Sequence, residues 1–167
     1  GEKYDEQELC RYTKEFLTNY YAENKVPVKR GLYTLLRYLK DKGFMLAVAS
    51  SSPRREVERH LKDAEVFDYF QVIVCGDMVA KSKPEPEIYL KACALLGVEP
   101  RDCLALEDSR NGILSACSAG CRTIMVPDLW QPDEEILSMI AAKYDDLAQA
   151  ASSLESILFE DGESYSL

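Results

Sequence analysis

The chain has 167 residues, 47% of them hydrophobic and 29% charged, which is the composition of one folded globular domain rather than of a disordered segment. Its 29 acidic and 20 basic residues give a formal net charge of -9, so nucleic acid and anionic membrane surfaces are excluded as expected partners. No apolar stretch reaches the roughly 18 residues of a membrane-spanning helix, and the acidic start is unlike a signal peptide.

The cysteines indicate a reduced interior. None of them form a C-x-x-C pair, which argues against zinc-ribbon and thioredoxin chemistry. Several stand in apolar runs, where cysteine packs as a small hydrophobic residue. We therefore expect a cytoplasmic protein. The six cysteines are Cys10, Cys75, Cys93, Cys103, Cys117 and Cys121.

Helical and strand patterns alternate along the chain. Residues 6–24 have the spacing of an amphipathic helix, and a second helical stripe follows Gly31 and ends near Gly43. The apolar run at 44–49 predicts a buried strand, and the serines and proline after it are typical of a helix start. Further strands are expected at 71–75, 101–106 and 122–126, and further helices at 86–96, 111–119, 133–142 and 147–158. This order predicts an α/β fold with a doubly wound, mainly parallel, Rossmann-like sheet.

Ligand sites of such sheets form beyond the carboxyl ends of the strands, and the first polar loop there is Ser50-Ser51-Ser52. Its hydroxyls and the free amides of a helix start favour binding of a phosphoryl group. Simple capping of the helix is the alternative interpretation.

The second loop, residues 81–86, contains two lysines and two prolines. Prolines restrict the backbone, and a lysine held in this way provides a compact positive charge for a phosphate. We expect Lys83 to have this role and Lys81 to be solvated.

The third loop places the adjacent carboxylates of Glu107 and Asp108 at the end of a strand, just before Asn111 and Gly112. Neighbouring acids repel unless a cation lies between them, and hard oxygen ligands suit Mg²⁺. Two ordinary acids at a helix start are the alternative.

Together, three segments resemble motifs of the haloacid-dehalogenase-like (HAD) superfamily, in the branch of β-phosphoglucomutase and phosphoglycolate phosphatase. An apolar strand ends in Ser50, a Lys-Pro-x-Pro sequence begins at Lys83, and a Glu-Asp-Ser-x-x-Gly sequence begins at Glu107. The resemblance implies a HAD-like core over residues 26–167 that lacks its first strand. Residues 1–25 look like the end of a helical cap.

This resemblance implies a Mg²⁺-dependent phosphatase or phosphomutase that acts on a small phosphorylated metabolite through a phospho-aspartate. Ser50 and Lys83 would be the catalytic residues, and Glu107 and Asp108 would bind Mg²⁺. Phosphate or substrate contacts would come from Ser51, Ser52, Arg54 and Asn111, with Arg55 near a distal part of the substrate. Pro53 departs from the lysine that the phosphoglucomutase has there.

The sequence contains no Asp-x-Asp motif, which supplies the nucleophile of such enzymes. We therefore expect a fragment that is inactive alone. A degenerate phosphate-binding or interaction module is the main alternative. A dinucleotide-binding Rossmann domain is the third, although no G-x-G-x-x-G follows any predicted strand. The substrate, the choice between phosphatase and mutase, and the oligomeric state stay open.

Overall fold

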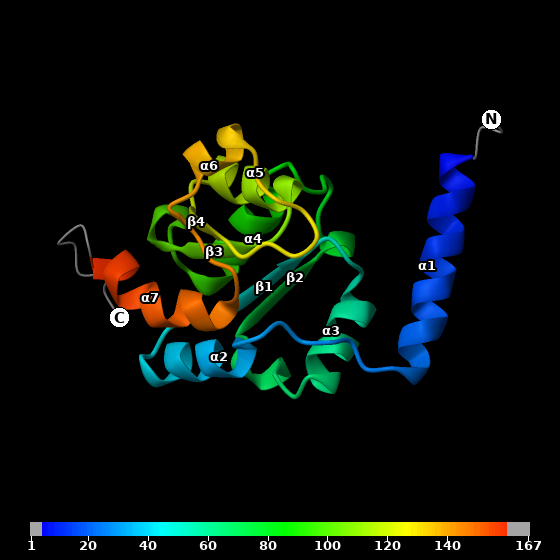
Figure 1. Cartoon of the computed structure of the whole chain (residues 1–167), viewed down its shortest axis with the longest axis horizontal. Helices are drawn as coiled ribbons and strands as arrows, with labels where there is room; N and C mark the ends of the chain where they lie inside the picture. Colours follow the sequence, from blue (N-terminus) through cyan, green and yellow to red (C-terminus); the bar gives the residue numbers. More distant parts are fainter. Residues whose placement is uncertain (1–4, 160–167) are drawn as a thin grey trace.

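The computed structural model describes residues 5–159 and shows alternating helices and strands (Figure 1). The α-helices are α1 (Glu6–Glu23), α2 (Leu32–Asp41), α3 (Arg54–Asp63), α4 (Glu87–Leu96), α5 (Arg110–Ala119), α6 (Glu134–Met139) and α7 (Leu147–Phe159). The strands are β1 (Ala47–Ser50), β2 (Val72–Cys75), β3 (Leu104–Glu107), β4 (Arg122–Met125) and β5 (Ala142–Lys143). None of the described helices is long and apolar enough to cross a membrane.

The strands are parallel, which confirms the predicted α/β class, but they form two sheets instead of one. β1 pairs with β2, so that Ser50 lies opposite Cys75. β3, β4 and β5 form the second sheet. Within the described chain β1 and β3 each have a single neighbouring strand, so each leaves one edge without strand pairing.

The two sheets are joined by two helices, one on each sheet, that pack against each other. Helix α4 contacts β1 and β2, and it also packs against α5, which lies on β3 and β4. One apolar cluster therefore runs from the first sheet to the second, which is why strands such as β2 are almost wholly apolar. Its buried members are Val74, Ile88, Tyr89, Ala92, Cys93, Ala105, Ala116, Ala119 and Cys121.

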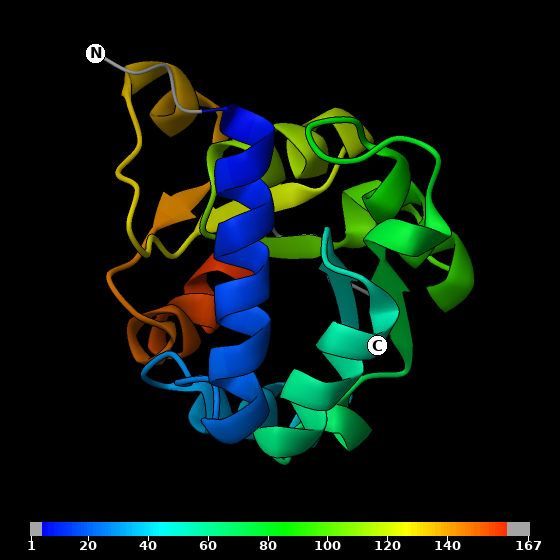
Figure 2. The ribbon, with the colours of Figure 1, turned by 90° about the vertical axis from the view of Figure 1, so that its right-hand side faces the viewer.

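Helices α2 and α7 pack together on the opposite side, against β4. Gly31, which begins α2, has a φ of 89°, and a Cβ there would lie 2.1 Å from the Ala148 amide nitrogen of α7. A glycine is therefore required where these two helices meet. Helix α1 stands beside this body at the side of α3, as Figures 1 and 2 show from two directions.

The predicted helix at 133–142 is wrong only in its last three residues: α6 ends at Met139, and β5 begins at Ala142. The backbone is already extended at Ile140. The amide of Ala141 donates to the Thr123 carbonyl at 2.8 Å, and that of Tyr144 donates to the Met125 carbonyl at 2.9 Å. Pairing with β4, which the local pattern does not encode, outweighs the helical spacing of this short segment.

Candidate active site

An open pocket of about 410 Å³ lies at the carboxyl ends of β1 and β3, one edge strand from each sheet. Residues distant in sequence meet there, as expected for parallel strands. The pocket is lined by Lys29, Ala49, Ser50, Ser51, Ser52, Lys83, Leu106, Glu107, Asp108, Ser109, Val126 and Leu147.

The serine loop forms the first wall of this pocket. The Ser50 hydroxyl accepts a hydrogen bond from the Ser52 amide at 3.2 Å. Gly76, which follows β2, donates its amide to the Ser52 carbonyl at 3.0 Å. A Cβ at Gly76 would lie 2.2 Å from the Ser51 carbonyl oxygen, so only glycine permits this approach. The loop is thus held against the end of the neighbouring strand.

Lys83 connects the two sheets at the base of the pocket. Its Nζ donates to the Ala49 carbonyl of β1 at 3.1 Å and to the Glu107 carboxylate of β3 at 2.5 Å. The Lys83 side chain is only 10% exposed. Its Nζ also lies 5.0 Å from the centroid of the Tyr89 ring, within the range of a cation–π contact. This lysine is therefore fixed in position rather than solvated.

The loop that carries Lys83 is itself anchored. The Glu87 carboxylate accepts the amides of Ala80 and Lys81, each at 2.8 Å. These two hydrogen bonds lower the pKa of Glu87 below its ordinary value. The Ser115 hydroxyl of α5 donates to the Glu85 carbonyl at 2.6 Å. Lys81 is exposed, as expected for a solvated lysine.

Glu107 is the most buried acid of the pocket and has several donors besides Lys83. The Tyr89 hydroxyl donates to the same carboxylate oxygen, and the other oxygen accepts the Asp108 amide at 3.3 Å. Burial, with the nearby Glu107 charge, raises the pKa of Tyr89 well above its usual range. A Cβ at Gly112 of α5 would lie 1.8 Å from this carboxylate, which explains a glycine in the first turn of the helix.

Asp108 is more accessible and faces Lys29, a residue that the sequence analysis did not select. Lys29 Nζ lies 3.9 Å from a carboxylate oxygen of Asp108 and 3.7 Å from one of Asp128. Lys29 precedes α2 and follows no strand, so its position in the sequence gave no signal. Tyr89 was also missed, because its helical spacing is that of a core residue.

The acids present fit a metal site only in part. Asp108 is half-exposed and has only long ion pairs, so its oxygens are accessible to a cation. The carboxylate of Glu107 is used by Lys83 and Tyr89. Among residues 5–159 no three histidine, cysteine or acidic side chains form a group that could hold a metal ion. The described residues therefore do not form a complete Mg²⁺ site.

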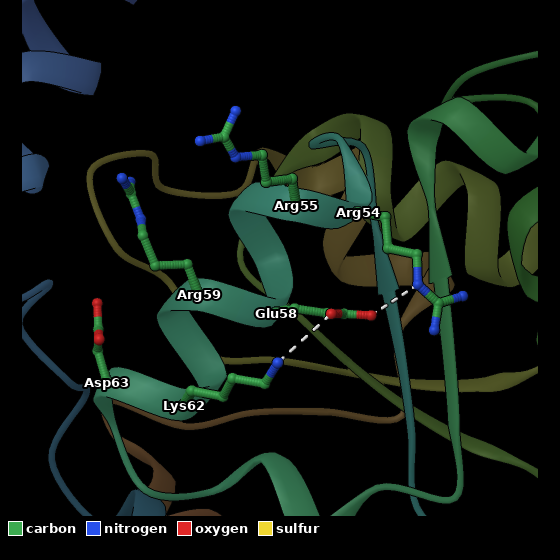
Figure 3. Close-up of a pocket in the computed structure, with 6 residues that line it drawn as sticks. All are labelled: Arg54, Arg55, Glu58, Arg59, Lys62 and Asp63. Atoms are coloured by element: carbon green, nitrogen blue, oxygen red, sulfur yellow. Dashed lines mark hydrogen bonds and ion pairs between the residues drawn. The ribbon is translucent and has the colours of Figure 1, made fainter.

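Two predicted site residues lie elsewhere. Arg54 lines a different pocket along α3, shown in Figure 3, where it donates to Glu58 at 2.7 Å. Asn111 is exposed on α5 and does not line the pocket of Ser50 and Lys83. The structure thus gathers Ser50, Ser51, Ser52, Lys83, Glu107 and Asp108 and leaves out Arg54 and Asn111.

Residues 1–126 match the family model of the haloacid dehalogenase-like hydrolases. Protein CbbY from Rhodobacter capsulatus is 36% identical over 136 residues, which cover 78% of this chain and 59% of that protein. Hexitol phosphatase B from Escherichia coli (strain K12) is 35% identical over 106 residues, covering 64% of this chain and 48% of that enzyme. The chain therefore matches about half the length of these relatives.

The fold is also similar to that of solved structures. CbbY from Rhodobacter sphaeroides, crystallised in complex with phosphate, has a TM-score of 0.74 and 33% sequence identity, covering 86% of this chain and 64% of that one. A β-phosphoglucomutase from Clostridium difficile has a TM-score of 0.74 at 24% identity, covering 96% of this chain and 71% of that one, and supports the fold alone.

Proposed function

Because the chain belongs to the haloacid dehalogenase-like hydrolase family, we propose that its pocket binds the phosphoryl group of a small phosphorylated metabolite. The reaction that it serves is Mg²⁺-dependent hydrolysis or transfer of that group through a phospho-aspartate. The observation that carries this proposal is the position of Lys83, buried and fixed beside Ser50 at the carboxyl ends of two parallel strands.

The hydrogen-bond capacity of Lys83 supports a role in phosphate binding. An ammonium group has three donors, and two of them are used by Ala49 and Glu107. The third is free to bind a phosphoryl oxygen. The Ser50 hydroxyl lines the same pocket and can donate a second hydrogen bond. Fixed donors and charge of this kind provide most of the catalysis in phosphoryl transfer.

Asp108 is the residue that would hold Mg²⁺, with its remaining ligands supplied from outside the described residues. When bound, the ion would neutralise part of the phosphoryl charge. Glu107 stays a predicted metal ligand, although its contacts favour a different role, the positioning of Lys83. Lys29 Nζ lies between Asp108 and Asp128, at 3.9 Å and 3.7 Å.

We infer that this chain alone does not turn over phosphate esters, because its sequence contains no Asp-x-Asp nucleophile motif. A strand carrying such a motif would fit between β1 and β3, each of which has an edge without strand pairing in the described chain. A phosphate-binding module without catalysis is the second candidate, and the same missing motif favours it.

Binding of inorganic phosphate tests the pocket separately from catalysis. We expect ³¹P NMR or calorimetry to detect binding to the wild-type chain, and the variants Ser50→Ala and Lys83→Met to bind at least tenfold more weakly. The matched control is Lys81→Met, because Lys81 is exposed in the same loop. Binding by Lys83→Met as strong as that of wild type would contradict the proposed site.

A further inference from the structure

Three cysteines lie together at the amino ends of β3 and β4, away from the strand ends that line the candidate active site. Cys93 belongs to α4, Cys103 precedes β3, and Cys121 precedes β4. The Sγ atoms of Cys93 and Cys103 are 3.6 Å apart. Since Leu104 of β3 lies opposite Arg122 of β4, the cysteines that precede them are neighbours across the two strands. All three are free thiols.

The three thiols differ in their exposure to solvent. Cys93 and Cys121 are buried in the apolar cluster between the sheets, at 4% and 7% exposure, whereas Cys103 is only partly buried. A small reagent in solution therefore reaches Cys103 first. Within the described part of the chain these thiols do not form a group that could hold a metal ion. Formation of a disulfide is the other reaction that adjoining thiols undergo.

The geometry at Cys103 allows such a bond to form. An S–S bond is about 2.0 Å long, so each sulfur of the Cys93–Cys103 pair needs to move by about 0.8 Å. The Cys103 thiol would give up only a weak hydrogen bond, at 3.5 Å, to the Glu99 carbonyl. The Cys103 backbone is held by hydrogen bonds of 3.0 Å with Pro100 and Arg122. Rotation of the side chains, without a break in these backbone contacts, therefore brings the two sulfurs together.

We propose that Cys93 and Cys103 are an oxidation site, at which hydrogen peroxide converts the two thiols into an intrachain disulfide. The Cys103 sulfur attacks a peroxide oxygen, so that the O–O bond breaks, one water leaves and a sulfenic acid forms. The Cys93 sulfur then attacks the Cys103 sulfur, so that the S–O bond breaks and a second water leaves. The thiols lose two electrons and two protons, and the peroxide is reduced to two waters.

The surroundings of Cys103 make this oxidation slow at neutral pH. Burial, together with the adjoining Cys93 thiol and the nearby Asp102, raises the pKa of Cys103 to about 12. The thiolate is the reactive form of a cysteine, and little of it is present near pH 7. The disulfide therefore forms under sustained exposure to the oxidant rather than within seconds.

The disulfide would cross-link two elements that support the pocket. Tyr89, one turn before Cys93 in α4, donates its hydroxyl to Glu107 at the carboxyl end of β3. The proposed bond joins the same helix to the amino end of the same strand. It uses no residue that lines the pocket, so the oxidation site is independent of the proposed function.

Peptide mapping tests the proposal, because trypsin cleaves after Arg101 and so separates the two cysteines. The wild-type chain is incubated with hydrogen peroxide at about pH 8.5, where more thiolate is present, then alkylated and digested without reduction. We expect peptides 92–101 and 102–110 to be joined, with two hydrogens fewer than their sum, and to separate on treatment with dithiothreitol. Unjoined peptides, or linkage of either one to peptide 111–122, which contains Cys121, would overturn the proposal.

Matched variants and a thiol titration make the assignment specific. Cys103→Ala should abolish the linkage, whereas Cys117→Ala, at another partly buried cysteine, should retain it. Titration of free thiols in the unfolded wild-type chain should show a loss of two of the six after oxidation. An equal loss in Cys103→Ala, or loss of the linkage in Cys117→Ala, would show that the oxidised pair is a different one.

Discussion

Glu107 holds the ammonium of Lys83, and the two side chains are only 7% and 10% exposed. We expect Glu107→Gln to destabilise the chain by about 3 kcal/mol, because it leaves a buried charge without its counter-ion. Urea denaturation measures this change, with Asp102→Asn at an exposed position as the control. The double variant Lys83→Met/Glu107→Leu should recover part of the loss, since it removes both charges. A loss of less than 0.5 kcal/mol, roughly the range of a surface substitution, would contradict the importance of the pair.

At Gly112, two effects of a substitution by alanine on the free energy of unfolding have opposite signs. Alanine normally stabilises a helix relative to glycine by about 1 kcal/mol. At Gly112 a Cβ would overlap the Glu107 carboxylate, so Gly112→Ala should lower the free energy of unfolding and disturb Lys83. Thermal unfolding shows whether Gly112→Ala lowers or raises the stability, with Ser118→Ala on the exposed face of α5 as the control. An increase in stability would show that Glu107 is placed differently.

Sequence patterns predicted the polar residues that follow strands, because strand ends of a parallel sheet meet at one edge. Ser50, Lys83, Glu107 and Asp108 indeed line one pocket. Lys29 and Tyr89 could not be predicted in this way, since neither follows a strand and their positions depend on packing between distant elements. Arg54 stays a predicted substrate contact, but in the structure it pairs with Glu58 of its own helix and does not line this pocket.

The Lys83 loop is held by one acid, Glu87, whose carboxylate accepts the amides of Ala80 and Lys81. Its pKa is lowered in the folded chain by two backbone amides. Its contribution to stability is therefore present above its ordinary pKa of 4.5 and is lost as the pH falls through the lowered value. Glu87→Gln should destabilise the chain at pH 7, and the difference from wild type should shrink below pH 4.5.

Urea denaturation at pH 7 and about pH 3 measures this difference. Glu85→Gln is the matched control, because Glu85 is exposed in the same loop. A difference between wild type and Glu87→Gln that grows toward low pH would show that the two amide hydrogen bonds do not stabilise the carboxylate form.

At the level of elements, periodicity predicted every long helix and the four main strands, because each carries an apolar stripe or run of the matching period. Helix α1 shows that such a stripe need not be buried, since its Leu9, Tyr12 and Phe16 are exposed. It failed for β5, a strand of two residues that depends on pairing with β4. Periodicity also could not predict that the strands form two sheets, since the sequence pattern of a strand does not determine which strand it pairs with. The local pattern singled out Lys83, but not the contacts by which its Nζ joins Ala49 of one sheet to Glu107 of the other.

In the molecule as a whole, two parallel sheets are joined by the packing of α4 against α5, and Lys83 contacts a strand end of each sheet. The pocket has donors and charge for a phosphoryl group, but the sequence has no Asp-x-Asp motif to attack it. Under the proposed function, this chain binds the phosphoryl group, and turnover requires a further strand with a nucleophilic aspartate.

Mg²⁺-dependent hydrolysis of p-nitrophenyl phosphate tests this separation most directly. The assay compares the chain alone, the chain extended at its N-terminus by a strand carrying Asp-x-Asp, and the extended chain with Lys83→Met. We predict turnover only for the extended chain with Lys83 intact. Sustained Mg²⁺-dependent turnover by the chain alone, or an inactive extended chain that is folded, would contradict the account.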